Sequence, residues 1–130
     1  MSEGGPAERL GLCSGAVVLE TGWDEDADER LRAGIRDITG EKFVDVDFDG
    51  EADAVLLWLR RRDVEFSECL LDAAAPLKDG GVLWALVPKS GLDQHIGAGE
   101  FAEAVRTAEL RLDGTVEASL EWSVHRLLVP

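Results

Sequence analysis

The sequence is poor in the residue types that mark metal centres, disulfide-rich scaffolds and membrane spans. Its 130 residues include two cysteines, two histidines, one methionine and no tyrosine. Cys13 and Cys69 lie far apart and form no CxxC pair, so two reduced thiols are expected. No apolar run approaches the roughly 18 residues of a membrane-spanning helix, and no basic and apolar signal region opens the chain. These absences argue against a zinc site and a membrane protein, and they predict a cytoplasmic location.

Positive charge is also scarce. Thirteen Lys and Arg residues stand against 27 Asp and Glu residues, which gives a net charge of −14 at pH 7. Such a chain opposes binding to nucleic acids and to anionic membranes, because both attract basic surfaces. The composition therefore predicts protein partners with neutral or basic surfaces. Whether the chain forms an oligomer is left open.

The length and the hydrophobic pattern predict one domain with one core. Residues 1–10 combine Gly, Pro and charge and are predicted to be a flexible leader, while residues 11–130 form the folded domain. Strands and helices alternate, which predicts an α/β fold of three layers with a mainly parallel sheet and a C-terminal antiparallel strand pair. Strands are expected at 16–19, 42–51, 53–59, 80–88, 115–118 and 123–129, and helices at 25–38, 65–77 and around 101–108.

The stretch "DAVLLWLRRRDVEFSECLLDAAAPLKDGGVLWALVPKSG", residues 53–91, carries a family resemblance. It resembles the fourth strand, helix and fifth strand of class I S-adenosylmethionine-dependent methyltransferases, including their Leu–Lys–x–Gly–Gly turn. This resemblance implies a Rossmann-like fold. The short interval between 42–51 and 53–59 leaves no room for the third strand and helix of a full methyltransferase, so the domain is expected to be truncated.

Over residues 8–130 the chain resembles a family of small acidic actinobacterial proteins whose function is not assigned. The shared blocks are "GWDEDADERLRAGIRDITG", "DAVLLWLR", "LKDGGVLWALVPK" and "EWSVHRLLV". This resemblance brings no catalytic residues with it. None can therefore be assigned by analogy.

The segment "LETGWDEDADERLRAGI", residues 19–35, stands where class I methyltransferases carry an acid–x–Gly–x–Gly–x–Gly cofactor loop. Glu20 and Gly22 fit that pattern, but Asp24 and Asp26 replace the second and third glycines. Their side chains fill the space that the ligand would enter, and their charge repels its carboxylate. The sequence predicts a degenerate loop and no bound cofactor, and it favours Asp24 or Asp26 as the cap of the following helix.

Two acidic stretches partly match the ligand pattern of a calcium-binding loop. Asp45, Asp47 and Asp49 match the first ligands of a calcium-binding loop, but the twelfth position is Leu56 where a Glu is needed. The stretch from residue 24 to residue 28 fails in the same way, with isoleucine at its twelfth position. No metal site is predicted. By position, one of the acids at 45–49 could also fill the ribose-binding role of a methyltransferase.

The remaining candidates define a possible partner or ligand surface. Trp58 and Trp84 are expected in the core, whereas Trp23 and Trp122 cap it or anchor a partner. The basic cluster Arg60–Arg62 is expected to face solvent and balance nearby acids. The full set is Trp23, Asp24, Asp26, Asp28, Asp45, Asp47, Asp49, Arg60, Arg61, Arg62, Lys89 and His95.

Taken together, these features favour a non-catalytic binding or regulatory protein over an enzyme. The alternative is a small enzyme or metabolite-binding protein that uses a pocket at the carboxyl ends of the strands, with Arg60–Arg62, Lys89 and His95 as its polar lining. A third hypothesis is a subunit whose partner completes the missing half of the sheet.

Overall fold

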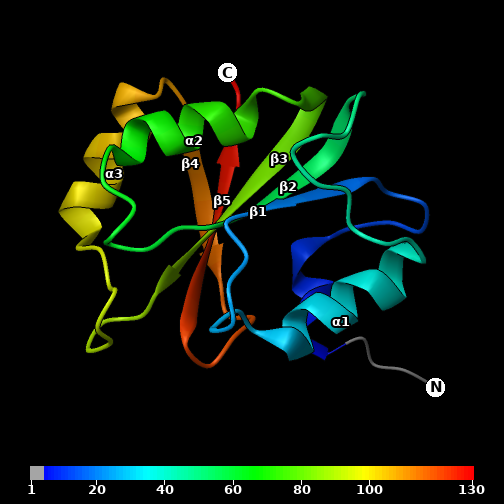
Figure 1. The fold of residues 1–130 in the computed structure, drawn as a ribbon, viewed down its shortest axis with the longest axis horizontal. Helices are drawn as coiled ribbons and strands as arrows, with labels where there is room; N and C mark the ends of the chain where they lie inside the picture. Colours follow the sequence, from blue (N-terminus) through cyan, green and yellow to red (C-terminus); the bar gives the residue numbers. More distant parts are fainter. Residues whose placement is uncertain (1–4) are drawn as a thin grey trace.

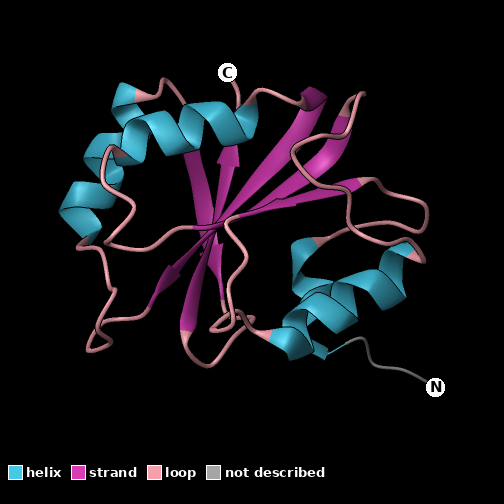
Figure 2. Cartoon of the chain, viewed as in Figure 1, coloured by secondary structure: helices cyan, strands magenta, loops and turns pink. Residues whose placement is uncertain are grey.

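The computed structural model describes residues 5–130; residues 1–4, the start of the predicted leader, lie outside the described residues. Within 5–130, five strands form one sheet with helices on both faces (Figures 1 and 2). The elements are the 3-10 helix η1 (Gly5–Leu10), the strands β1 (Val18–Thr21), β2 (Ala52–Trp58), β3 (Leu77–Pro88), β4 (Arg111–Val116) and β5 (Trp122–Leu128), and the helices α1 (Glu29–Thr39), α2 (Phe66–Ala74) and α3 (Ala98–Thr107). No helix in this part of the chain combines the length and apolarity needed to cross a membrane.

The strand order is β1-β2-β3-β5-β4. β1, β2 and β3 run parallel, and β5 pairs antiparallel with both β3 and β4. This arrangement confirms the predicted α/β class, with a parallel part followed by a C-terminal antiparallel pair. The carboxyl ends of β1 and β2 therefore lie side by side, which brings the segments that follow them together.

The sheet has an apolar core on each face. Alternate residues of β2 point to opposite sides, so Trp58 packs with α1 and η1 while Leu57 packs with α2 and α3. Figure 1 shows α2 and α3 on one side of the sheet and α1 on the other. Trp58 and Trp84 are both buried, as predicted, and Trp122 is buried with them. We call the two sides the α1 face and the α2 face.

The N-terminal segment differs from the sequence prediction. Residues 5–10 form η1, and Ala7 and Leu10 are buried in the core of the α1 face. Gly34 of α1 allows this approach, because a Cβ there would lie 2.8 Å from the Cβ of Ala7. The prediction of a flexible leader is thus corrected for residues 5–10, which cover α1.

The acidic segment 42–51 is not a strand. Its one bridge in the described chain joins Val44 to Leu19 of β1, after which the side chain of Asp45 accepts a hydrogen bond from the backbone of Asp47 at 3.0 Å. Aspartate side chains compete in this way for backbone donors and favour turns. The alternating pattern that predicted a strand here reflects a turn.

The helix predicted at 25–38 begins later, at Glu29. Its N-cap is Asp28, whose carboxylate accepts a hydrogen bond from the backbone of Leu31 at 3.1 Å. Asp24 and Asp26 do not cap it, because their carboxylates bind arginines instead. Gly40 ends the helix in the left-handed conformation, as expected.

Candidate functional site: the loop after β1 and the groove beside it

Residues 22–28 form the loop that follows β1, and Gly22 brings it against the end of β2. Gly22 has a φ of 81°, and a Cβ there would lie 2.5 Å from the carbonyl oxygen of Trp58. Only glycine tolerates both the backbone conformation and this contact. The packing of the loop against β2 therefore requires glycine at position 22, whether or not the loop binds a ligand.

Glu20 braces α1 against the sheet. Both of its carboxylate oxygens accept hydrogen bonds from Arg32 at 2.6 Å, and one also accepts a bond from the indole of Trp58 at 2.9 Å. The hydrogen bond with Glu20 is the main reason why the pKa of Arg32 is raised. Glu20, the acid that matches the cofactor motif, therefore uses both carboxylate oxygens in hydrogen bonds within the protein.

The guanidinium of Arg60 fills the space beneath the loop. Arg60 is only 2% exposed, and its Nη1 donates to the carbonyl of Gly22 at 2.8 Å. Its Nε and Nη2 donate to the two carboxylate oxygens of Asp26 at 3.0 and 2.5 Å. Its charge also lies 5.2 Å from the ring centre of Trp122. The hydrogen bond from Arg60 is the largest cause of the lowered pKa of Asp26.

The prediction that Arg60–Arg62 face solvent together is therefore wrong for Arg60. Burial is possible because Asp26 and the carbonyls of Gly22 and Trp58 satisfy its charge and donors. Arg61 and Arg62 do face solvent, and each binds an acid: Arg61 pairs with Glu100 at 2.8 Å and Arg62 with Asp24 at 2.7 Å. The cluster balances nearby acids, because each of its three arginines forms an ion pair with an acid of the same chain.

Two of the other predicted surface residues, Trp23 and Asp28, also belong to the loop after β1. Trp23 is half exposed, and its indole donates to Glu29 at 3.4 Å. Asp28 caps α1 and also accepts a hydrogen bond from Ser119 at 2.6 Å. Of this set, the residues that meet around the loop after β1 are Trp23, Asp24, Asp26, Asp28, Arg60 and Arg62.

Lys89 and His95 follow β3, and the loop that carries His95 contacts Arg62, whose backbone donates to the side chain of Gln94 at 2.8 Å. Lys89 pairs with Glu117 at 3.3 Å, and Nδ1 of His95 donates to the carbonyl of Pro88 at 2.7 Å. Asp45, Asp47 and Asp49 occupy the turn between α1 and β2 and are exposed. Within residues 5–130 no group of three or more His, Cys, Asp or Glu residues is placed to bind a metal.

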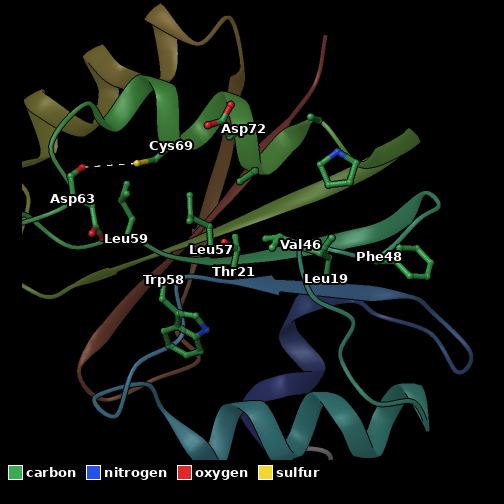
Figure 3. Close-up of a pocket in the computed structure, with 14 residues that line it drawn as sticks. Leu19, Thr21, Val46, Phe48, Leu57, Trp58, Leu59, Asp63, Cys69 and Asp72 are labelled. Atoms are coloured by element: carbon green, nitrogen blue, oxygen red, sulfur yellow. Dashed lines mark hydrogen bonds between the residues drawn. The ribbon is translucent and has the colours of Figure 1, made fainter.

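A groove of about 590 Å³ opens on the α2 face, between α2 and the turn at 44–48 (Figure 3). Its floor is apolar, and its wall on α2 contains Cys69 and Asp72. None of Arg60–Arg62, Lys89 or His95 lines it, so this groove does not have the polar lining expected for a pocket at the strand ends. We call this feature the α2 groove; its main lining residues are Leu19, Val46, Phe48, Leu57, Leu59, Asp63, Cys69, Asp72 and Ala73.

Sequence reasoning missed the α2 groove, although one signal for it was present. No helix is predicted between the helix at 25–38 and the strand at 53–59, so no helix of that interval covers the α2 face over β1.

The thiol of Cys69 has a raised pKa, first because of burial and then because of Asp63 and Asp72, with smaller effects from other acids of this region. Cys69 is accordingly a protonated thiol at neutral pH and a poor nucleophile.

Comparison with solved structures assigns the architecture to a known class of fold. A methyltransferase dependent on S-adenosylmethionine from Aquifex aeolicus superposes with a TM-score of 0.70 at 13% identity, over 96% of this chain and 89% of that one. A TehB-like methyltransferase of the same cofactor class from Corynebacterium glutamicum gives 0.61 at 14% identity, over 95% and 85%. The fold is that of the class I methyltransferases, a Rossmann-like α/β domain.

Within that class of fold, the chain belongs to the family described as protein of unknown function (DUF3052), whose model matches residues 7–130. It is 40% identical over 124 residues to the uncharacterized protein Rv2239c of Mycobacterium tuberculosis, covering 95% of this chain and 78% of that protein. The uncharacterized protein Mb2263c of Mycobacterium bovis gives the same values. The predicted resemblance to an actinobacterial family without assigned function is confirmed.

Proposed function

We propose that this protein is a non-catalytic binding or regulatory module of the cytoplasm, built on a methyltransferase-like fold that no longer binds S-adenosylmethionine. The observation that carries the proposal is the buried guanidinium of Arg60. It donates hydrogen bonds to the carbonyl of Gly22 and to the carboxylate of Asp26, and so it holds the loop against the end of β2. A cofactor would have to displace these contacts and lie close to the carboxylates of Asp24 and Asp26.

Titration with S-adenosylmethionine tests the loss of the cofactor. We expect isothermal titration calorimetry of the full chain to detect no binding with a dissociation constant below about 1 mM. This limit corresponds to a binding free energy of about −4 kcal/mol. A methyltransferase known to bind the cofactor serves as the positive control. Substitution of Gly22 is unsuitable as a specificity control, because a side chain there strikes Trp58 whether or not a ligand binds. A micromolar dissociation constant would overturn this part of the proposal.

The proposed partner is a protein with a basic or neutral surface. The acids best placed to meet it are those not engaged in the loop, above all Asp47 and Asp49, which are exposed on the turn at 44–48 and just beyond it. Like charges gathered on one surface steer oppositely charged partners and disfavour acidic ones. Asp24, Asp26 and Asp28 contribute less, because each already serves an arginine or a helix end.

Affinity capture from extract of the native cell tests this surface. We expect the tagged wild-type chain to retain a partner, and the double variant Asp47→Asn/Asp49→Asn to retain much less of it. Higher salt should weaken the retention further, because exposed charges are screened. Asp37→Asn is the matched control, since Asp37 is an exposed acid on α1, on the other face of the sheet. Equal recovery by the double variant and the control would remove the acidic turn from the interface.

A further inference from the structure

The α2 groove lies where the helical layer of the α2 face is incomplete. α2 and α3 pack over the core that includes Leu57 and Leu83, whereas a turn without a helix borders the same core beside Leu19 of β1, through Val44. Figure 3 shows α2 above the floor of the groove and the labelled Val46 and Phe48 at one end of it. An apolar sheet face is normally covered by a layer of helices. The groove is therefore an opening that a further helix would fill.

The charged residues that line the groove, Asp63 and Asp72, are both acids. The turn and strand at 43–59 and the segment at 63–77 contain no Lys or Arg. Asp53 is bound by Lys78, which comes from outside these two segments. The carboxylates of Asp63 and Asp72 border the groove on the side of Cys69, and after burial they are the next causes of the raised pKa of that thiol. The acids of the two segments are Asp45, Asp47, Asp49, Glu51, Asp53, Asp63, Glu65, Glu68 and Asp72.

We propose that the α2 groove binds an amphipathic helix of a partner protein, with apolar residues along one side and Lys or Arg along its flanks. The apolar side would contact Val46 and Phe48 and close the opening above the buried floor at Leu57, and the basic flanks would face the acids of the turn and of α2. Helices enter grooves of this kind by residues spaced i, i+3, i+4 and i+7. The inference rests on the proposed role as a binding protein and names the surface and the partner for it.

The exposure of Val46 favours a helix over a ligand held inside the groove. Val46 is 69% exposed although it lines the groove, so the apolar surface continues beyond the cavity. A molecule of the size of the cavity would leave this part of the surface in water. A helix laid along the sheet would cover it, and removing this apolar surface from water would favour binding.

A fluorescently labelled model peptide tests the proposal directly. The peptide has about 18 residues, with leucines at helical spacing on one face and lysines elsewhere. One control has the same composition in an order that scatters the leucines around the helix, and a second has glutamate in place of each lysine. By fluorescence anisotropy, we expect the full chain to bind the amphipathic basic peptide at least about tenfold more tightly than either control. The scattered peptide keeps the charge, so it measures attraction to the acidic protein in general.

Paired variants of the protein then locate the binding site. Val46→Glu is expected to weaken binding about tenfold or more, whereas Val129→Glu, at an exposed valine outside the groove, should leave it within about twofold. Asp72→Lys should weaken it several-fold relative to Asp37→Lys; both are exposed acids at the third position from the end of a helix, on opposite faces of the sheet. Circular dichroism confirms that the variants fold.

Two outcomes would overturn the inference. The first is equal binding of the amphipathic and scattered peptides, and the second is equal binding by Val46→Glu and Val129→Glu. The same valine variants in affinity capture separate this failure from that of the proposed function. If both retain the cellular partner equally, the groove is wrong and the binding role stands; if the wild-type chain retains no partner, the binding role itself fails.

Discussion

Replacing Gly22 with alanine is expected to lower the free energy of unfolding by about 3 kcal/mol or more. The left-handed conformation at φ 81° costs an alanine about 1–2 kcal/mol. The added Cβ would also lie 2.5 Å from the carbonyl oxygen of Trp58, so the loop or the end of β2 must shift. Overpacking of this kind costs a further 1–3 kcal/mol, roughly.

Gly80 supplies the matched control for this prediction. It has the same φ of 81°, but a Cβ there meets nothing within 4 Å. Gly80→Ala should therefore cost about 1–2 kcal/mol, the conformational part alone. Urea denaturation of both variants measures the difference. Equal losses would mean that the contact between the loop and β2 contributes nothing.

The sequence predicts the parts of this fold that depend on local pattern. The runs at 53–59 and 80–88 are apolar at nearly every position, which is the pattern of parallel strands buried on both faces, and both are strands. Gly40 and Pro76 mark helix ends by their backbone chemistry, and the helices do end there. The antiparallel terminal pair follows from two β-rich runs separated by a few residues.

The parts that depend on tertiary contact were predicted poorly. Residues 5–10 look mobile in isolation, because their composition does not reveal that Ala7 and Leu10 meet α1. The burial of Arg60 depends on the meeting of two loops that follow neighbouring parallel strands, and its partner Asp26 lies 34 residues away. The topology predicts that those loops meet, but it does not say which of three consecutive arginines turns inward.

Of these three arginines, Arg60 is expected to contribute most to the stability of the fold. Arg60→Ala removes a guanidinium that is 2% exposed, together with its bonds to Asp26, Gly22 and the ring of Trp122. Removing one partner of a buried pair costs about 3–5 kcal/mol; because the side chain of Asp26 is half exposed and regains water, we expect about 3 kcal/mol. The loss for Arg60→Lys should lie between zero and the loss for Arg60→Ala, since an ammonium group keeps the charge but cannot make the bidentate contact with Asp26. Chemical denaturation measures each loss.

Arg62→Ala is the control, because Arg62 and Asp24 form a similar pair in which both side chains are about half exposed. Exposed pairs contribute about 0–1 kcal/mol, so a loss of about 0.5 kcal/mol is expected. Comparable losses from Arg60→Ala and Arg62→Ala would show that the burial of Arg60 is not what fastens the loop.

The loss caused by Arg60→Ala should also depend on pH, through the carboxyl group of Asp26. In the folded protein the pKa of Asp26 lies below its ordinary value of 3.8, mainly because Arg60 donates hydrogen bonds to the charged form. A lowered pKa stabilises the folded state fully above the ordinary value, and this stabilisation is lost as the pH falls through the folded pKa. The difference in unfolding free energy between wild type and Arg60→Ala should hence be constant near neutrality and shrink below a pH of about 4. A difference that stays unchanged down to pH 2.5, roughly, would mean that the ion pair with Asp26 adds nothing to the packing of the Arg60 side chain against Trp122.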